Sequence, residues 1–167
     1  MSLTQVRHLM DELCFNGMLS NLEEVLTKNQ EGSLTFLEGL DHLLQAERQH
    51  RGFKATQARI MRSKIRKGAS LEDFDLTKGR HITRAQLRDL ESLRWCHEGK
   101  PLILVGPTGV GKTYLARALG VRACENGKHV LFMTVTEFLE NQSTARATNA
   151  YLRFRDKLTR PDLLILD

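Results

Sequence analysis

A glycine-rich turn between an apolar run and a helical pattern constrains the fold of this chain more than any other feature. Residues 102–105 read Leu-Ile-Leu-Val, a run typical of a strand, and residues 106–113 read Gly-Pro-Thr-Gly-Val-Gly-Lys-Thr. Apolar residues at helical spacing then begin at Leu115. The G-x-x-x-x-G-K-T pattern between a strand and a helix is the P-loop, which holds phosphate groups. The sequence therefore predicts an α/β fold with a parallel sheet.

Each residue type in this turn has a chemical reason to be there. Glycines let backbone N–H groups approach phosphate oxygens without a Cβ in the way, and the following helix adds the positive end of its dipole. Lys112 supplies a positive charge for the β- and γ-phosphates, and the Thr113 hydroxyl can ligate Mg²⁺. The predicted ATP-binding residues are Gly106, Pro107, Thr108, Gly109, Val110, Gly111, Lys112, Thr113 and Tyr114.

A second apolar run ends in an acidic residue. Residues 163–166 read Leu-Leu-Ile-Leu, and Asp167 follows them. A short apolar run of this kind predicts a buried parallel strand. An acid at its carboxyl end would lie at the edge of the sheet where phosphates bind. We therefore expect Asp167 to take the Walker B role and to hold Mg²⁺ opposite Thr113.

The composition excludes several other classes of protein. The sequence has no run of 18 apolar residues that could span a membrane, and its start lacks the basic and apolar pattern of a secretory signal. The three cysteines, Cys14, Cys96 and Cys124, fit neither a zinc site nor a disulfide framework. We therefore expect a cytoplasmic protein with no membrane partner.

Positive charge is concentrated in one short segment. Residues 47–67 carry eight basic and one acidic side chain, a net charge of +7, whereas the whole chain carries +5. Apolar spacing predicts a helix from an N-cap at Ser33 to about Arg66. Its basic stripe consists of Arg48, Arg51, Arg59, Arg62 and Arg66. Charge alone leaves two interpretations open: a surface that binds nucleic-acid phosphates, or a solvated basic face.

Helical spacing also fills the start of the chain. Residues 3–29 follow it, with a break near Asn16-Gly17. The sequence thus predicts a helical N-terminal domain with the basic stripe over residues 1–68. Residues 69–167 would form the N-terminal part of an ATP-binding domain, from the P-loop to Walker B.

Four segments together resemble one protein family. They are LTFLEGLDHLLQAERQHR at residues 34–51, SLEDFDLTKGRHITRAQLRDLESLRWCHEGK at 70–100, GPTGVGKTYLARALG at 106–120 and LLILD at 163–167. In these segments the chain resembles the IstB-like transposition helper ATPases, which are relatives of the DnaC-type helicase loaders within the AAA+ class. The resemblance implies an AAA+ type P-loop NTPase sheet, incomplete at its C-terminal side and preceded by a helical domain.

The resemblance also implies a function. It suggests an ATP- and Mg²⁺-binding homo-oligomer that binds the DNA backbone with little sequence preference and assists a transposase. Two alternatives are a helicase-loading adaptor and a DNA-binding remnant that does not hydrolyse ATP. In the family a second acid follows the Walker B aspartate, and the sensor residues and arginine finger come later, whereas this sequence ends at Asp167. From the residues present we expect ATP binding without turnover.

Overall fold

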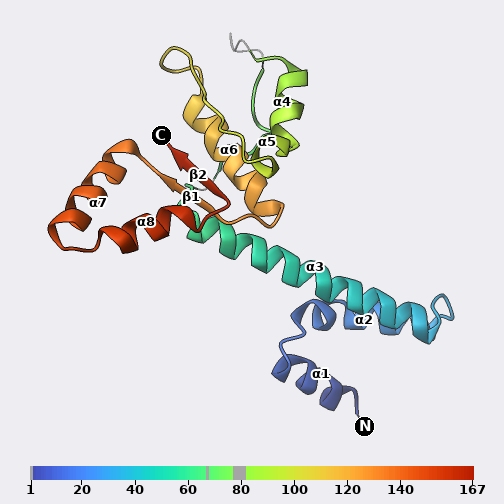
Figure 1. Ribbon diagram of the computed structural model, residues 1–167. Helices are drawn as coiled ribbons and strands as arrows, with labels where there is room; N and C mark the ends of the chain where they lie inside the picture. The colour runs from blue at the N-terminus through green and yellow to red at the C-terminus, as the bar shows by residue number, and fades with distance from the viewer. Residues whose placement is uncertain (1, 67, 77–81) are drawn as a thin grey trace. The chain divides into compact units, whose positions relative to one another are not determined.

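The computed structural model describes residues 2–66, 68–76 and 82–167 (Figure 1). The elements follow one another as α1 (Leu3–Glu12), α2 (Asn16–Gln30), α3 (Phe36–Arg62), α4 (Arg84–Glu91), α5 (Arg94–His97), α6 (Lys112–Glu125), β1 (Val130–Met133), α7 (Val135–Ala147), α8 (Tyr151–Thr159) and β2 (Leu163–Leu166). The chain divides into two compact units, Met1–Gln57 and Ala58–Asp167. The domain boundary expected at residue 68 stays a prediction. None of the described helices is both long and apolar enough to cross a bilayer.

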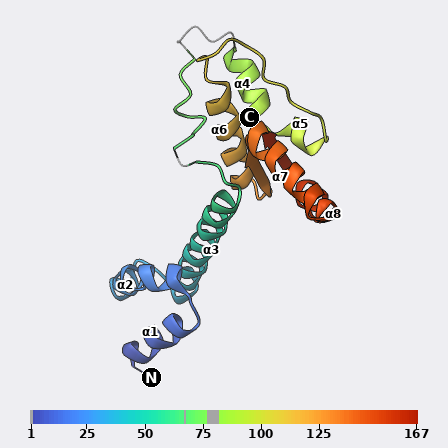
Figure 2. The same cartoon turned by 90° about the vertical axis from the view of Figure 1, so that its left-hand side faces the viewer.

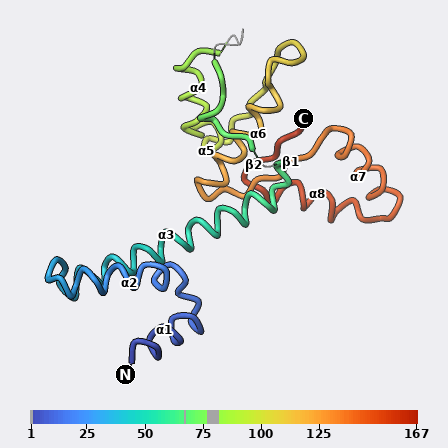
Figure 3. Tube along the Cα trace, turned by 180° about the vertical axis from the view of Figure 1, so that it is seen from behind, coloured from blue at the N-terminus to red at the C-terminus, as the bar shows by residue number. Residues whose placement is uncertain are grey.

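In the first unit, α2 runs alongside the first part of α3 (Figure 3). The apolar stripe of α2 forms a small core with α3, built from Met18, Leu22, Val25 and Leu43. The two helices approach so closely at Gly17 that a Cβ there would lie 2.5 Å from the carbonyl oxygen of Ala46. The predicted break between the first two helices lies slightly earlier than Asn16, because Cys14 takes a left-handed backbone conformation with φ 57°.

The carboxylate of Glu47 on α3 holds the first turn of α2. It accepts hydrogen bonds from the backbone N–H groups of Gly17 at 2.7 Å and Met18 at 3.2 Å. The Arg51 Nε group donates a further bond to it at 2.7 Å. The bond from Arg51, with the two backbone N–H groups in support, lowers the pKa of Glu47 from its ordinary value against the opposing effect of burial.

Helix α3 is shorter at both ends than its apolar spacing predicts. Thr35 and Glu38 form a reciprocal cap, with Glu38 N–H donating to Thr35 Oγ1 at 3.3 Å and Thr35 N–H donating to Glu38 Oε2 at 2.8 Å. Ser33, the expected N-cap, instead donates its hydroxyl to the Lys28 carbonyl. The helix ends at Arg62 because Lys64 has φ 64°, so Arg66 lies beyond it.

The second unit is organised around a parallel pair of strands. Val130 of β1 lies opposite Leu163 of β2, and the pairing continues to Met133 and Leu166, which confirms the parallel strand predicted at residues 163–166. The expectation that this strand is buried was wrong, because its residues are half-buried and Leu166 is exposed. Helices α7 and α8 connect the two strands on the side of the sheet away from α6 (Figures 1 and 2). The other edge of β1 is covered as well, since Phe132 N–H donates to the Ser63 carbonyl at 2.8 Å.

The strand predicted at residues 102–105 does not form within the described part of the chain. This segment and β2 instead line a cavity of about 550 Å³, and Leu102, Ile103 and Leu164 are among its lining residues. A strand requires a hydrogen-bonded neighbour, and within the described residues β2 pairs with β1 alone. Ile103 and Val105 are consequently 80% and 89% exposed. The predicted parallel sheet is therefore smaller than expected.

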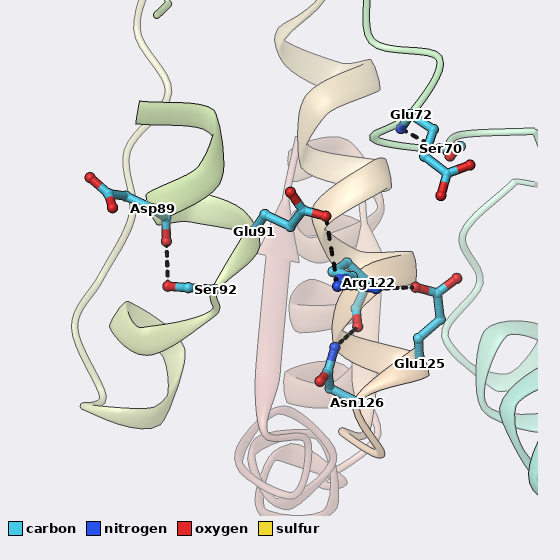
Figure 4. A network of polar contacts seen from close by, with 8 residues as sticks. All are labelled: Ser70, Glu72, Asp89, Glu91, Ser92, Arg122, Glu125 and Asn126. Carbon is cyan, nitrogen blue, oxygen red and sulfur yellow. Dashed lines mark hydrogen bonds and ion pairs between the residues drawn. The ribbon is translucent and has the colours of Figure 1, made fainter. Parts of the chain in front are cut away.

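An ion pair joins α4 to α6 (Figure 4). Arg122 on α6 lies 3.7 Å from the carboxylate of Glu91 on α4 and 3.4 Å from that of Glu125. The Asn126 side chain donates to the Arg122 carbonyl at 2.9 Å, where α6 ends. The ion pair between Arg122 and Glu91 thus links the segment upstream of the P-loop to the helix that follows it.

Candidate nucleotide-phosphate site

The backbone of the P-loop requires glycine at two positions. Gly109 and Gly111 have φ 86° and 91°, the left-handed region that residues with a Cβ rarely adopt. Gly111 is the N-cap of α6 and supplies no capping side chain. The first N–H groups of α6 are therefore left for another acceptor, and a phosphate oxygen suits them by charge and by geometry.

Lys112, the first residue of α6, folds back over the turn. Its ammonium group donates to the carbonyl oxygens of Gly106 at 2.9 Å and Pro107 at 2.8 Å. A bound phosphate would offer this ammonium a stronger, charged acceptor than either carbonyl. The structure thus places the predicted lysine directly over the turn whose N–H groups would receive the same phosphate.

Thr113 and Asp167, the two residues predicted to hold Mg²⁺, lie together. The Thr113 hydroxyl donates to Asp167 Oδ1 at 2.7 Å. The backbone of Asp167 is fixed at the end of β2, because its N–H donates to the Met133 carbonyl and its own carbonyl accepts from Val135 N–H. A hydroxyl and a carboxylate on fixed supports are hard oxygen ligands that suit Mg²⁺.

Thr113 and Asp167 suit a metal ion that is also bound by a phosphate group. Within the described ranges, the structure contains no cluster of three or more His, Cys, Asp or Glu side chains that could hold an ion alone. Mg²⁺ commonly keeps several waters and takes one or two protein ligands together with substrate phosphates. Thr113 and Asp167 match that pattern, with Lys112 adjacent to Thr113 on the same helix.

Two of the five arginines predicted to bind DNA donate hydrogen bonds within the described chain. Arg51 donates to Glu47 and also lies over the Phe15 ring, 5.4 Å from its centroid. The Arg59 Nε group donates to the Cys124 carbonyl at 2.9 Å, in the last turn of α6. The side chains of Arg48, Arg62 and Arg66 are exposed. The binding of DNA by any of these five residues stays a prediction.

Sequence reasoning missed the contacts that join the P-loop helix to the upstream segment. The Tyr114 hydroxyl bonds both backbone groups of Ser70, and its ring lies against that of Phe74. Tyr114 and Ser70 are 44 residues apart, and no spacing rule links positions so distant. The only signal in the sequence was the position of Tyr114 directly after the P-loop threonine.

Two of the three cysteines lie in surroundings that disfavour a reactive thiolate. Burial raises the pKa values of the Cys96 and Cys124 thiols, which favours the protonated form. Cys14 is exposed. All three thiols are free in the structure.

Comparison with known proteins finds matches over nearly the whole chain. Residues 8–167 match the family described as "IstB-like ATP binding protein". The chain is 35% identical over 162 residues to an insertion-sequence ATP-binding protein of Mycobacterium tuberculosis. This match covers 97% of this chain and 64% of that protein. It is 36% identical over 157 residues to the IS1162 ATP-binding protein of Pseudomonas fluorescens, and this match covers 93% of this chain and 68% of that protein.

A third relative is named as a protein of the insertion sequence IS21. The chain is 32% identical over 159 residues to the IS21 ATP-binding protein of Pseudomonas aeruginosa, covering 95% of this chain and 60% of that protein. The chain therefore spans somewhat less than two thirds of the length of the M. tuberculosis and P. aeruginosa relatives.

Proposed function

Because this chain belongs to the family of IstB-like ATP-binding proteins, we propose that it binds ATP with Mg²⁺ and assists a transposase on DNA. The observation that carries the nucleotide part is the meeting of Thr113 and Asp167 beside the P-loop lysine. The relatives are proteins of insertion sequences by name, which supports the role in transposition.

Each group at the site has a defined task in this proposal. The N–H groups of the turn and the Lys112 ammonium bind the β- and γ-phosphates. Thr113 and Asp167 hold the ion on the side of the site where β2 ends. Mg²⁺, when bound, neutralises phosphate charge. Asp167 thereby links the nucleotide to the strand pair, and Lys112 and Thr113 link it to α6.

DNA binding rests on the distribution of charge. Residues 47–67 carry a net charge of +7, and Arg48, Arg62 and Arg66 present exposed guanidinium groups. Guanidinium groups bind phosphate oxygens without regard to base sequence. We propose that these residues track the DNA backbone, and that copies of the chain assemble on the DNA next to the transposase.

The magnesium ligands provide the test of the nucleotide site. Calorimetric titration with ATP should give tighter binding with Mg²⁺ than without it. Asp167→Asn and Thr113→Val should each reduce this difference, because each removes one proposed oxygen ligand of the ion. Asp162→Asn is the matched control, since Asp162 precedes the same strand and donates no ligand in the proposal. An unchanged Mg²⁺ dependence in both site variants would contradict the assignment.

A further inference from the structure

A second cavity, of about 240 Å³, opens beside the P-loop. Gly106, Pro107 and Lys112 of the turn contribute to its wall, and Phe74, Ile82 and Leu115 supply apolar side chains. We call it the base cavity. A group that enters it while phosphates lie on the turn must suit a largely apolar lining and be joined to the phosphates by a short link. A nucleobase meets both conditions, and aromatic side chains are common stacking partners for bases.

The aromatic wall of the base cavity comes from a turn, not from a helix or strand. Phe74 N–H donates to the Leu71 carbonyl at 3.2 Å, and Glu72 N–H donates to the Ser70 hydroxyl at 3.2 Å (Figure 4). These bonds shape the turn, but they lie within it and cannot anchor it to the rest of the unit. Contacts from outside the turn therefore hold Phe74 in place, and some of them are apolar, since Phe74 belongs to a buried cluster with Leu115 and Leu119 of α6.

Tyr114 adds a polar contact from the same helix. Its hydroxyl donates to the Ser70 carbonyl at 3.1 Å and accepts from Ser70 N–H at 3.2 Å. One side chain thus satisfies both backbone groups of the residue that begins the turn. The ring centroids of Tyr114 and Phe74 are 6.1 Å apart with planes inclined by 25°, so the two rings support each other between the turn and the helix.

We infer that the Tyr114 hydroxyl helps to position the nucleobase: by bonding Ser70, at the start of the turn at residues 70–74, to α6, it supports Phe74 as a wall of the base cavity. The inference rests on the proposed binding of ATP at the P-loop. Tyr114 acts through Phe74 and is a positioning residue. The hydroxyl contributes to the binding of the base and leaves the binding of the phosphates to the turn, Lys112 and Thr113.

Two ligands separate these contributions. ATP carries the base, and inorganic tripolyphosphate carries only the phosphates. Calorimetry with Mg²⁺ should show that Tyr114→Phe weakens ATP binding by roughly five- to tenfold, the effect of about one net hydrogen bond, and leaves tripolyphosphate binding unchanged. Tyr151→Phe is the matched control, because it removes the hydroxyl of the other tyrosine, on α8, and should change neither affinity.

The outcomes distinguish this inference from the proposed function. Equal losses for both ligands, or no loss for either, in folded Tyr114→Phe would overturn the inference and leave ATP binding intact. A wild-type chain that binds neither ligand would overturn both. If Tyr114→Phe fails to fold, Phe74→Leu decides in its place. That variant keeps an apolar side chain and should also lose ATP affinity selectively, and equal affinities to wild type would overturn the inference.

Discussion

The Thr113 hydroxyl donates a hydrogen bond of 2.7 Å to the Asp167 carboxylate, across 54 residues of sequence. The contact joins the first turn of α6 to the residue that follows β2. It brings two oxygen ligands to the point where the P-loop lysine also lies, so a metal-bound triphosphate could meet all three residues. The proposed function depends on this relationship.

Gly17 should be sensitive to the smallest substitution. Gly17→Ala places a Cβ 2.5 Å from the Ala46 carbonyl oxygen, and a backbone atom cannot yield as a side chain would. We expect a loss of about 1–3 kcal/mol in the free energy of unfolding, measured by urea unfolding. Gly52→Ala is the matched control: nothing lies within 4 Å of its Cβ position on α3, so a gain of about 0.5–1 kcal/mol is expected. Equal effects would contradict the close helix approach.

Glu47 should make the stability of the chain depend on pH in acid. Its folded pKa is lowered from the ordinary value of 4.5. A lowered folded pKa gives a contribution that is complete above the unfolded pKa and is lost as pH falls through the folded one. Glu47→Gln should therefore flatten the fall in the urea midpoint below about pH 4.5. Glu31→Gln removes an exposed carboxylate instead, and a similar flattening in that variant would contradict the role of Glu47.

DNA affinity should depend on salt through the exposed arginines. Each neutralised phosphate contributes about 0.9 to the slope of log K against log salt, so Arg62→Ala with Arg66→Ala should reduce the slope by about 1.8. Arg59 is left out because its bond to the Cys124 carbonyl gives it a structural role. Fluorescence anisotropy with two unrelated duplexes is the measurement. The control pair is Arg153→Ala with Arg155→Ala on α8; a lower slope in that pair alone would move the interface there.

The P-loop and the Asp167 strand were predictable because their signals are local. Gly109 and Gly111 are fixed by backbone conformation, and the apolar run at residues 163–166 has the composition of a buried strand. The closeness of the P-loop and Asp167 follows from a general rule: phosphates bind at the carboxyl ends of parallel strands. The resemblance to a known family pointed to the same residues.

The remaining features depend on contacts that a sequence pattern does not contain. Residues 102–105 have the composition of a strand, but strand formation depends on a neighbour, and a cavity lies there instead. Arg51 and Arg59 look like members of a basic stripe until Glu47 and the Cys124 carbonyl are seen beside them. Spacing along a helix gives the face on which a charge lies; it does not give the partner that the charge meets.

Hydrogen exchange should report the difference between the two apolar runs. We expect the amides of residues 102–105 to exchange rapidly, because they form no strand, and those of β1 to exchange slowly, because both of its edges are bonded. Within the described residues β2 pairs on one side only, and an open edge of this kind promotes self-association. Slow exchange at residues 102–105 in a monodisperse monomer would contradict this account of the sheet.

Titration calorimetry with Mg-ATP on wild type and Lys112→Ala tests whether the P-loop binds the nucleotide. Lys112 is the charged group that the structure places over the P-loop. Lys157→Ala, which removes the same charge from an exposed position on α8, is the matched control. We predict that wild type and Lys157→Ala bind with equal affinity and that Lys112→Ala shows no binding. Equal affinity of wild type and Lys112→Ala would contradict nucleotide binding at the P-loop.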